Sequence, residues 1–218
     1  MPARFAARTI GLPAESLRMS GTIWNGFTRL DDAHTLSWET SGWASLQRMA
    51  LVVNWHLTGQ DTDLLGRLAV PLPPRADLAE LDAVRGRVGW PLVEAVLPGL
   101  AIRCDAYAVL DGVQVSLTKG LRRAAGTIVA PAGSCLNLQS DAPAVATPNL
   151  SAVLGSDDAG LVAVLVQSEA PTVPLATAKL TNSDQIVVTI HAAGAAMVPG
   201  MPASADSEIE MPLSTLIP

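Results

Sequence analysis

The sequence predicts a mainly β protein, either an antiparallel β-sandwich or a jelly-roll-like barrel, with one short helical insertion near residues 76–97. Two observations carry this prediction. Residues 49–58 alternate strictly between apolar and other side chains, and residues 100–218 consist of short β-like segments separated by turn residues. Strands without intervening helices are typical of antiparallel folds and not of doubly wound α/β folds.

The clearest single strand is predicted at residues 49–58. One face would carry Met49, Leu51, Val53, Trp55 and Leu57, and a period of two over this length indicates a half-buried strand. Further strands are expected at residues 22–30 and 35–39, on either side of a turn at Asp31 and Asp32. Trp38 has the parity of Leu36, so we expect both Trp38 and Trp55 to pack in the core.

The helical insertion is expected in two parts. Residues 77–85 place Leu78, Leu81 and Val84 on one stripe, and Gly86 follows the expected end. A second helical segment is expected at residues 91–97, because Pro91 suits a first helical position and Pro98 with Gly99 would end it.

Two hairpins are expected after residue 99. Asp111 and Gly112 suit a type I′ turn between strands at residues 106–110 and 113–117. Residues 182–184 would join strands at 176–181 and 185–192. Other strands are expected at residues 126–130, 135–139, 161–167 and 208–214.

The expected domain organisation is an extended N-terminal arm at residues 1–20 and a β-rich domain at residues 21–218, possibly divided into 21–99 and 100–218. The start of the chain lacks the apolar run of a secretory signal. Residues 185–205 are uncharged, but their glycines, prolines and initial alternation favour a strand and a loop over a membrane span.

Composition and charge exclude several classes of protein. Hydrophobic residues make up 49% of the chain and charged residues 16%, which excludes intrinsic disorder. The net charge of -6, without a basic cluster, argues against sequence-specific or general nucleic-acid binding. Residues 124–218 hold one lysine and eight acidic residues, so this half is expected to expose a solvated acidic surface.

No catalytic, metal-binding or cofactor-binding signature is recognised. The chain has no G-x-S-x-G, H-E-x-x-H, C-x-x-C or P-loop pattern, and its three histidines are dispersed. We therefore expect no enzyme activity, metal or cofactor. Cys104 and Cys135 are interpreted as small buried hydrophobic residues rather than a disulfide.

Function is predicted indirectly. The chain is apolar but has no membrane span, which suggests surface buried against partners. Twelve of its fourteen basic residues are arginine, a habit of structural proteins from GC-rich bacteriophages. We therefore expect a structural protein of a viral particle (a bacteriophage capsid, decoration or tail component), assembled in the host cytoplasm with copies of itself and other particle proteins.

Six residues are candidate interface or ligand contacts. They belong to the two chain ends and to the tryptophan-rich region, and they are Arg4, Arg8, Trp24, Trp43, Leu216 and Ile217. The alternative function is a carbohydrate- or receptor-binding β-module, in which exposed Trp24 and Trp43 would stack on a glycan.

Overall fold

The computed structural model describes residues 18–71, 78–96, 101–118, 121–138, 143–197 and 205–213. Most of these residues form strands, with three short helices. The elements in chain order are β1 (Arg18–Gly21), β2 (Asn25–Arg29), β3 (Thr35–Thr40), α2 (Gly42–Arg48), β4 (Ala50–Gly59), β5 (Thr62–Pro71), β6 (Glu80–Val88), α3 (Trp90–Val96), β7 (Ile102–Cys104), β8 (Ala108–Thr118), β9 (Leu121–Ala130), β10 (Gly133–Asn137), β11 (Val145–Thr147), β12 (Leu150–Asp157), β13 (Gly160–Gln167), β14 (Ala170–Thr181), β15 (Gln185–Ile190), α4 (Ala192–Ala195) and β16 (Ser207–Pro212).

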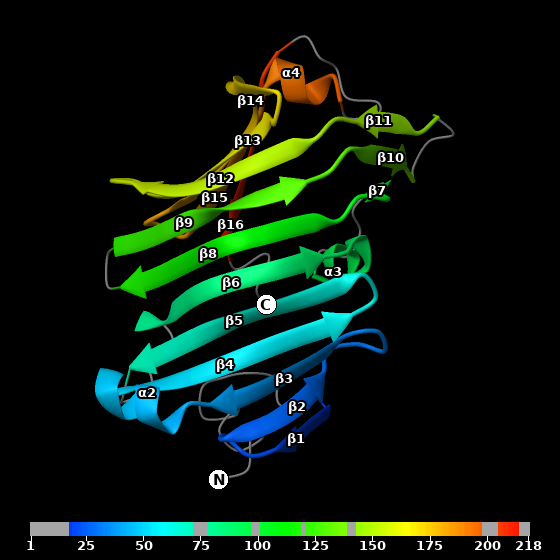
Figure 1. Cartoon of the computed structure of the whole chain (residues 1–218). Coiled ribbons are helices and arrows are strands. Elements are labelled where there is room, and N and C mark those ends of the chain that lie inside the picture. Colours follow the sequence, from blue (N-terminus) through cyan, green and yellow to red (C-terminus); the bar gives the residue numbers. More distant parts are fainter. Residues whose placement is uncertain are drawn as a thin grey trace.

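Thirteen strands form one large antiparallel sheet, whose order nearly follows the sequence (Figure 1). The order is β1-β2-β3-β4-β5-β6-β8-β9-β12-β13-β14-β15-β16, and β7, β10 and β11 form a second sheet of three strands. This architecture confirms the mainly β, antiparallel prediction and is consistent with a β-sandwich. The sheet is not a closed barrel, because β1 and β16 are its two edges.

The large sheet has an apolar face and a more polar face. Cross-strand partners share a face, and the register pairs Leu36 with Leu57, which pairs with Leu64. We call this the inner face, because the small sheet covers part of it. The opposite, outer face carries partners such as Glu39 and Asn54. The alternation predicted for residues 49–58 is therefore confirmed in β4 from Leu51 to Leu57, but Met49, which was expected on the same face, ends helix α2 instead and is exposed.

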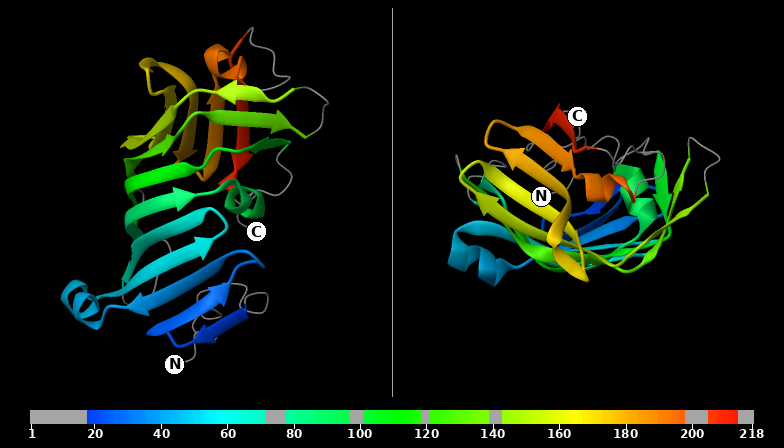
Figure 2. Two further views of the ribbon diagram at one scale, coloured as in Figure 1. Left: turned by 45° about the vertical axis from the view of Figure 1, so that its right-hand side comes forward. Right: turned by 90° about the horizontal axis from the view of Figure 1, so that it is seen from above.

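The sheet curls, so that its last strands turn back toward β8 and β9 (Figure 2). A cavity of about 230 Å³ lies inside the curl, and Ala124 of β9 and Ile186 of β15 both line it although these strands are not neighbours. Arg122 of β9 crosses the curl: its guanidinium donates to the Thr181 carbonyl over 2.9 Å and pairs with the Asp184 carboxylate.

The small sheet contains a disulfide between Cys104 of β7 and Cys135 of β10. The interpretation of these cysteines as free buried residues was wrong. The two strands are antiparallel and place Cys104 directly opposite Cys135, with 4.1 Å between the Cα atoms. Disulfides of this kind persist in oxidising surroundings.

The helical insertion is only partly observed. α3 agrees with the second predicted segment to within one residue at each end, but most of the first predicted helix is strand β6. The register of β6 shifts between Leu81 and Val84, and Ala83 between them has a φ of 53°. The bulge adds one residue, so Leu81 and Val84 reach the same face of a strand at a spacing that otherwise indicates a helix.

The prediction of a hairpin at Asp111 and Gly112 was also wrong. β8 continues through both residues, pairs with β6 on one side and β9 on the other, and shifts register between Asp111 and Gln114. Gly112 does adopt the predicted positive φ, at 61°, but it serves a bulge instead of a turn.

The second predicted hairpin is confirmed as β14 and β15. The Asp31 turn is also present, and the Asp31 carboxylate accepts the backbone N–H groups of Ala33 and His34. In the part of the chain that the structure describes, no helix has both the length and the apolar character needed to cross a membrane.

Candidate functional site

Helix α2 carries a cluster of exposed apolar side chains, which we call the α2 cluster. Trp43, Leu46 and Met49 are 71%, 73% and 80% exposed. Their spacing of three residues places them on one side of the helix, and α2 contributes no buried residue. An apolar group exposed to this degree is a candidate contact surface, and tryptophan is enriched at the energetic centres of interfaces.

The α2 cluster is held rigidly on the sheet. Ser45 Oγ donates to the Ser41 carbonyl at 2.7 Å and accepts the N–H of Val52 at 2.9 Å. Val52 lies in β4 and is completely buried. Met49 ends the helix with a φ of 49°, where its N–H reaches the Leu46 and Ser45 carbonyls. The three apolar side chains therefore project from a fixed base.

A second exposed apolar group lies on the outer face of the sheet, and we call it the valine patch. Val109, Val129 and Val153 are 39%, 41% and 52% exposed. Val109 and Val129 are cross-strand partners, and Val153 is a diagonal neighbour of Val129 through the Ser151 pair. The patch lies three to five strands from β4, so the two apolar surfaces of one chain are separate.

Trp24 is 54% exposed in the connection between β1 and β2, where its N–H donates to Thr22 Oγ1 over 3.1 Å. A groove of about 770 Å³ is lined by the next residue, Asn25, and by the exposed Phe27 with Glu39 and His56, but not by Trp24 itself. An exposed aromatic ring beside polar side chains resembles the composition of sugar sites. The carbohydrate-binding alternative stays a prediction.

Trp38 and Trp55 are cross-strand partners on the inner face. Each ring covers a neighbouring glycine: a Cβ added at Gly26 would meet Trp38, and one added at Gly66 would meet Trp55. Their half-buried position agrees with the packing role predicted for both rings, which lie over bare backbone.

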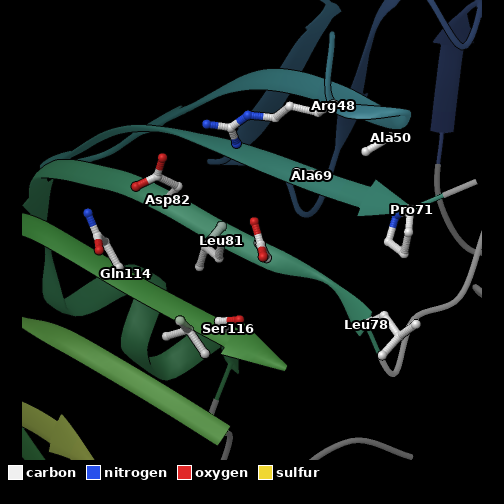
Figure 3. A pocket seen from close by; sticks show the side chains of 11 residues that line it. Arg48, Ala50, Ala69, Pro71, Leu78, Leu81, Asp82, Gln114 and Ser116 are labelled. Carbon is white, nitrogen blue, oxygen red and sulfur yellow. The ribbon is translucent and has the colours of Figure 1, made fainter. Parts of the chain in front are cut away.

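A hydrogen-bonding groove of about 620 Å³ lies beside α2 on the outer face (Figure 3). Arg48 extends from the end of α2 toward Asp82, and Gln114 lies on the neighbouring strand (Figure 3). Glu80 also lines the groove, which therefore holds two carboxylates, one guanidinium and one amide. This set can bind polar groups, and Ser116, the cross-strand partner of Glu80, also lines the groove.

An apolar cavity of about 390 Å³, here called the inner cavity, lies between the large sheet, the small sheet and α4. Its lining includes Leu165, Ala176 and Val188 from the large sheet and the disulfide from the small one. Trp90 of α3 also lines it, and the buried indole N–H of Trp90 has no hydrogen-bond partner in the part of the chain described.

A charged pocket of about 510 Å³, here called the polar pocket, adjoins the inner cavity. Trp90 and Cys104 line both. Arg103 donates to Glu94 at 2.9 and 3.0 Å within this pocket. The N–H and hydroxyl of Ser134 both donate to Asp105, and these bonds hold the pKa of Asp105 below its ordinary value.

Each histidine contacts a carboxylate. The pairs are His34 with Asp31, His56 with Asp63 and His191 with Asp206, at 2.8, 2.6 and 2.9 Å. Burial acts to raise the pKa of Asp31, but hydrogen bonds from His34 and from the N–H of Ala33 lower it below the ordinary value. Within the described ranges, no three potential ligands are grouped to hold a metal ion.

One histidine pair extends to a hydroxyl. Thr177 Oγ1 lies 3.2 Å from His191 Nε2, while His191 Nδ1 faces Asp206. The order of hydroxyl, imidazole and carboxylate resembles that of a catalytic triad. However, Thr177 lies in the middle of β14, between β13 and β15, and lines none of the cavities described above. Asp206 also accepts the N–H of Ala192 at 2.9 Å, so the group fastens α4 to the segment before β16.

The other predicted contacts, Arg4, Arg8, Leu216 and Ile217, lie outside the described residues. Leu46 and Met49 were not predicted as contacts, although their spacing from Trp43 by three and six residues is a visible signal in the sequence. Trp90 was not predicted either, because its contribution depends on the packing of two sheets. Comparisons with protein-family models, curated proteins and solved structures find no match to this chain.

Proposed function

We propose that this chain is a structural subunit that acts by assembling with copies of itself. The observation that carries the proposal is the α2 cluster, which exposes Trp43, Leu46 and Met49 on a helix anchored to the sheet. Leaving three such side chains in water is unfavourable, and burial against a partner would recover about 1.5–3 kcal/mol for each one buried fully.

The valine patch is the complementary surface in this proposal. The α2 cluster of one copy packs on Val109, Val129 and Val153 of the next, and each copy keeps one free surface of each kind. Such a head-to-tail contact produces a ring or a filament, according to whether its rotation closes. Repetition of this contact is the mechanism by which a stiff β-subunit builds a particle.

The particle that we propose is a virion, with this chain as a bacteriophage capsid, decoration or tail component. The apolar composition and the preference for arginine over lysine support this finer proposal. The disulfide in the small sheet suits a particle that survives outside the reducing cytosol. The partners would be copies of this chain and other particle proteins.

The test is the dependence of assembly size on concentration, measured by mass photometry and analytical ultracentrifugation. We expect oligomers that weaken by about thirtyfold or more in Trp43→Ser, because interface tryptophans commonly contribute 2 kcal/mol or more. Val153→Ser should weaken the same contact. Val173→Ser is the matched control, since Val173 is 47% exposed but lies outside both surfaces.

A chain that stays monomeric at every concentration would contradict the assembly function and favour the carbohydrate- or receptor-binding alternative. Equal assembly by Trp43→Ser and the control would show that the α2 cluster is not the contact. Electron microscopy of the assembled fraction distinguishes closed rings from filaments.

A further inference from the structure

The inner cavity and the polar pocket together have the composition of a site for an amphipathic small molecule. The cavity volume of about 390 Å³ falls in the range of about 300–1,000 Å³ found for small-molecule sites. Its described lining contains no charged side chain, and it includes Leu150, Ile190 and Met197. An apolar surface of this kind binds hydrocarbon groups best.

Trp90 gives the cavity a polar point at its boundary. The indole N–H is buried and lacks a partner in the described structure, and leaving a buried donor unsatisfied is unfavourable. Because Trp90 also lines the polar pocket, a ligand oxygen at this boundary could accept the hydrogen bond. The ligand would then pass from an apolar to a charged environment at this residue.

The charge of the polar pocket selects the head group. Three carboxylates and one guanidinium line it, and the guanidinium of Arg103 is already paired with Glu94. Asp61 and Asp105 remain as negative charges without a cationic partner among the described side chains. The hydrogen bonds from Ser134 lower the pKa of Asp105, which favours its charged form. A positive group is therefore favoured here and a negative one is repelled.

We propose that this chain binds a long-chain amphiphile with a cationic head, with its hydrocarbon in the inner cavity and its head in the polar pocket. This site is separate from the α2 cluster and from the valine patch, so it does not depend on the assembly function. The disulfide links the strands that form part of the cavity wall. The ligand-binding site is thus built by the small sheet against the large one.

The proposal is tested with three probes of equal chain length, dodecylamine, dodecanoate and dodecan-1-ol, by isothermal titration calorimetry at pH 7 on the full chain. At this pH the amine is protonated and the acid is ionised. We expect saturable 1:1 binding. Dodecylamine should bind about tenfold or more tightly than dodecanoate, and dodecan-1-ol should bind with an affinity between those two.

Two variants locate the site. Ala176→Leu fills the inner cavity and should lower dodecylamine affinity about tenfold or more, whereas Ala125→Leu, on the exposed outer face, should not. Asp61→Asn removes one pocket charge at a residue with a φ of 53°, which asparagine tolerates, and should reduce the preference for amine over acid. Asp158→Asn is the control of equal charge.

Several outcomes would overturn the proposal. Binding without saturation would show nonspecific adsorption to apolar surface, and unchanged binding in Ala176→Leu would place the ligand elsewhere. Equal affinity for amine and acid, or an unchanged preference in Asp61→Asn, would refute the cationic head. If Ala176→Leu loses its cooperative thermal unfolding, the comparison of Asp61→Asn with Asp158→Asn decides the proposal.

Discussion

Met49 holds a left-handed backbone conformation that costs an ordinary residue about 1–2 kcal/mol relative to the right-handed one. Glycine is the usual residue at such a helix end. The methionine side chain gains little from its own chain, because it is 80% exposed. Strain without an internal benefit is a feature of functional positions, and it supports a role for Met49 in contacts with another molecule.

Replacing Met49 by glycine should therefore change stability and assembly in opposite directions. We expect Met49→Gly to raise the free energy of unfolding of the monomer by about 1 kcal/mol, since glycine adopts this conformation without strain. The same change removes one side chain of the α2 cluster and should weaken association about tenfold, equivalent to 1.4 kcal/mol. Urea denaturation at low protein concentration and ultracentrifugation measure the two effects.

Ala83 provides the matched control. It has a similar φ of 53° but lies at the bulge of β6 and belongs to neither apolar surface. Ala83→Gly should gain comparable stability and leave association unchanged. A loss of association in both variants would attribute the effect to backbone flexibility instead of the methionine side chain.

Among the elements, the small sheet depends most on a covalent link. β7 and β11 contain three residues each, and β10 contains five. Sheets this short bury little surface and form few ladder hydrogen bonds. The disulfide joins strands that are 31 residues apart in the sequence, so it restricts a long loop of the unfolded chain.

Removal of the disulfide should destabilise the protein substantially. We expect the double variant Cys104→Ala/Cys135→Ala, or chemical reduction, to lower the free energy of unfolding by about 3–4 kcal/mol, the entropy expected for a loop of this length. Denaturant titration with and without a reductant measures the loss. Two thiols that react freely in the native protein, without a reductant, would contradict this prediction.

The elements also show where sequence patterns are reliable. The alternation in β4 and the turn between β14 and β15 depend on neighbouring residues, and both could be predicted. The bulges of β6 and β8 could not, because an extra residue at Ala83 imitates the helical spacing of Leu81 and Val84. Likewise, Asp111 and Gly112 have the same local chemistry in a bulge as in a turn.

The candidate site was less predictable than the fold. Trp43 could be singled out from its small, polar neighbours, and the structure places its ring in solvent. The inner cavity could not be predicted, since Trp90 and Ala176 meet there only after the sheet has curled. The disulfide was missed for the same reason, because a spacing of 31 residues does not reveal which strands pair.

At the scale of the whole molecule, the curl of the large sheet encloses much of the apolar interior. Arg122 secures it by bonding to Thr181 and Asp184, about sixty residues away in sequence. The Arg122 side chain is 19% exposed, so water screens this contact less than it screens a surface ion pair. A carbonyl and a carboxylate accepting from one guanidinium fix both position and direction.

Loss of this contact should loosen the curl. We expect Arg122→Met to lower the free energy of unfolding by about 1.5–3 kcal/mol, as found for hydrogen bonds to charged groups. Amide exchange should accelerate in β15 and β16, which the curl brings back toward β9. Arg123→Met is the control, because Arg123 points outward on the same strand. Equal losses in both variants would show that Arg122 has no special role.

The near-sequential strand order sets the order in which the molecule can form. Each strand of the large sheet can add to the one made just before it, apart from two excursions that supply β7 and the β10–β11 pair. Local pairing of this kind favours rapid folding and suits a chain that acquires structure during synthesis. Because β10 follows β9 in the sequence, β7 and β10 can pair only after β9 has been synthesised. Formation of the disulfide is therefore a late event. A chain whose synthesis stops before residue 135 would contain the N-terminal strands of the large sheet and an unpaired thiol at Cys104.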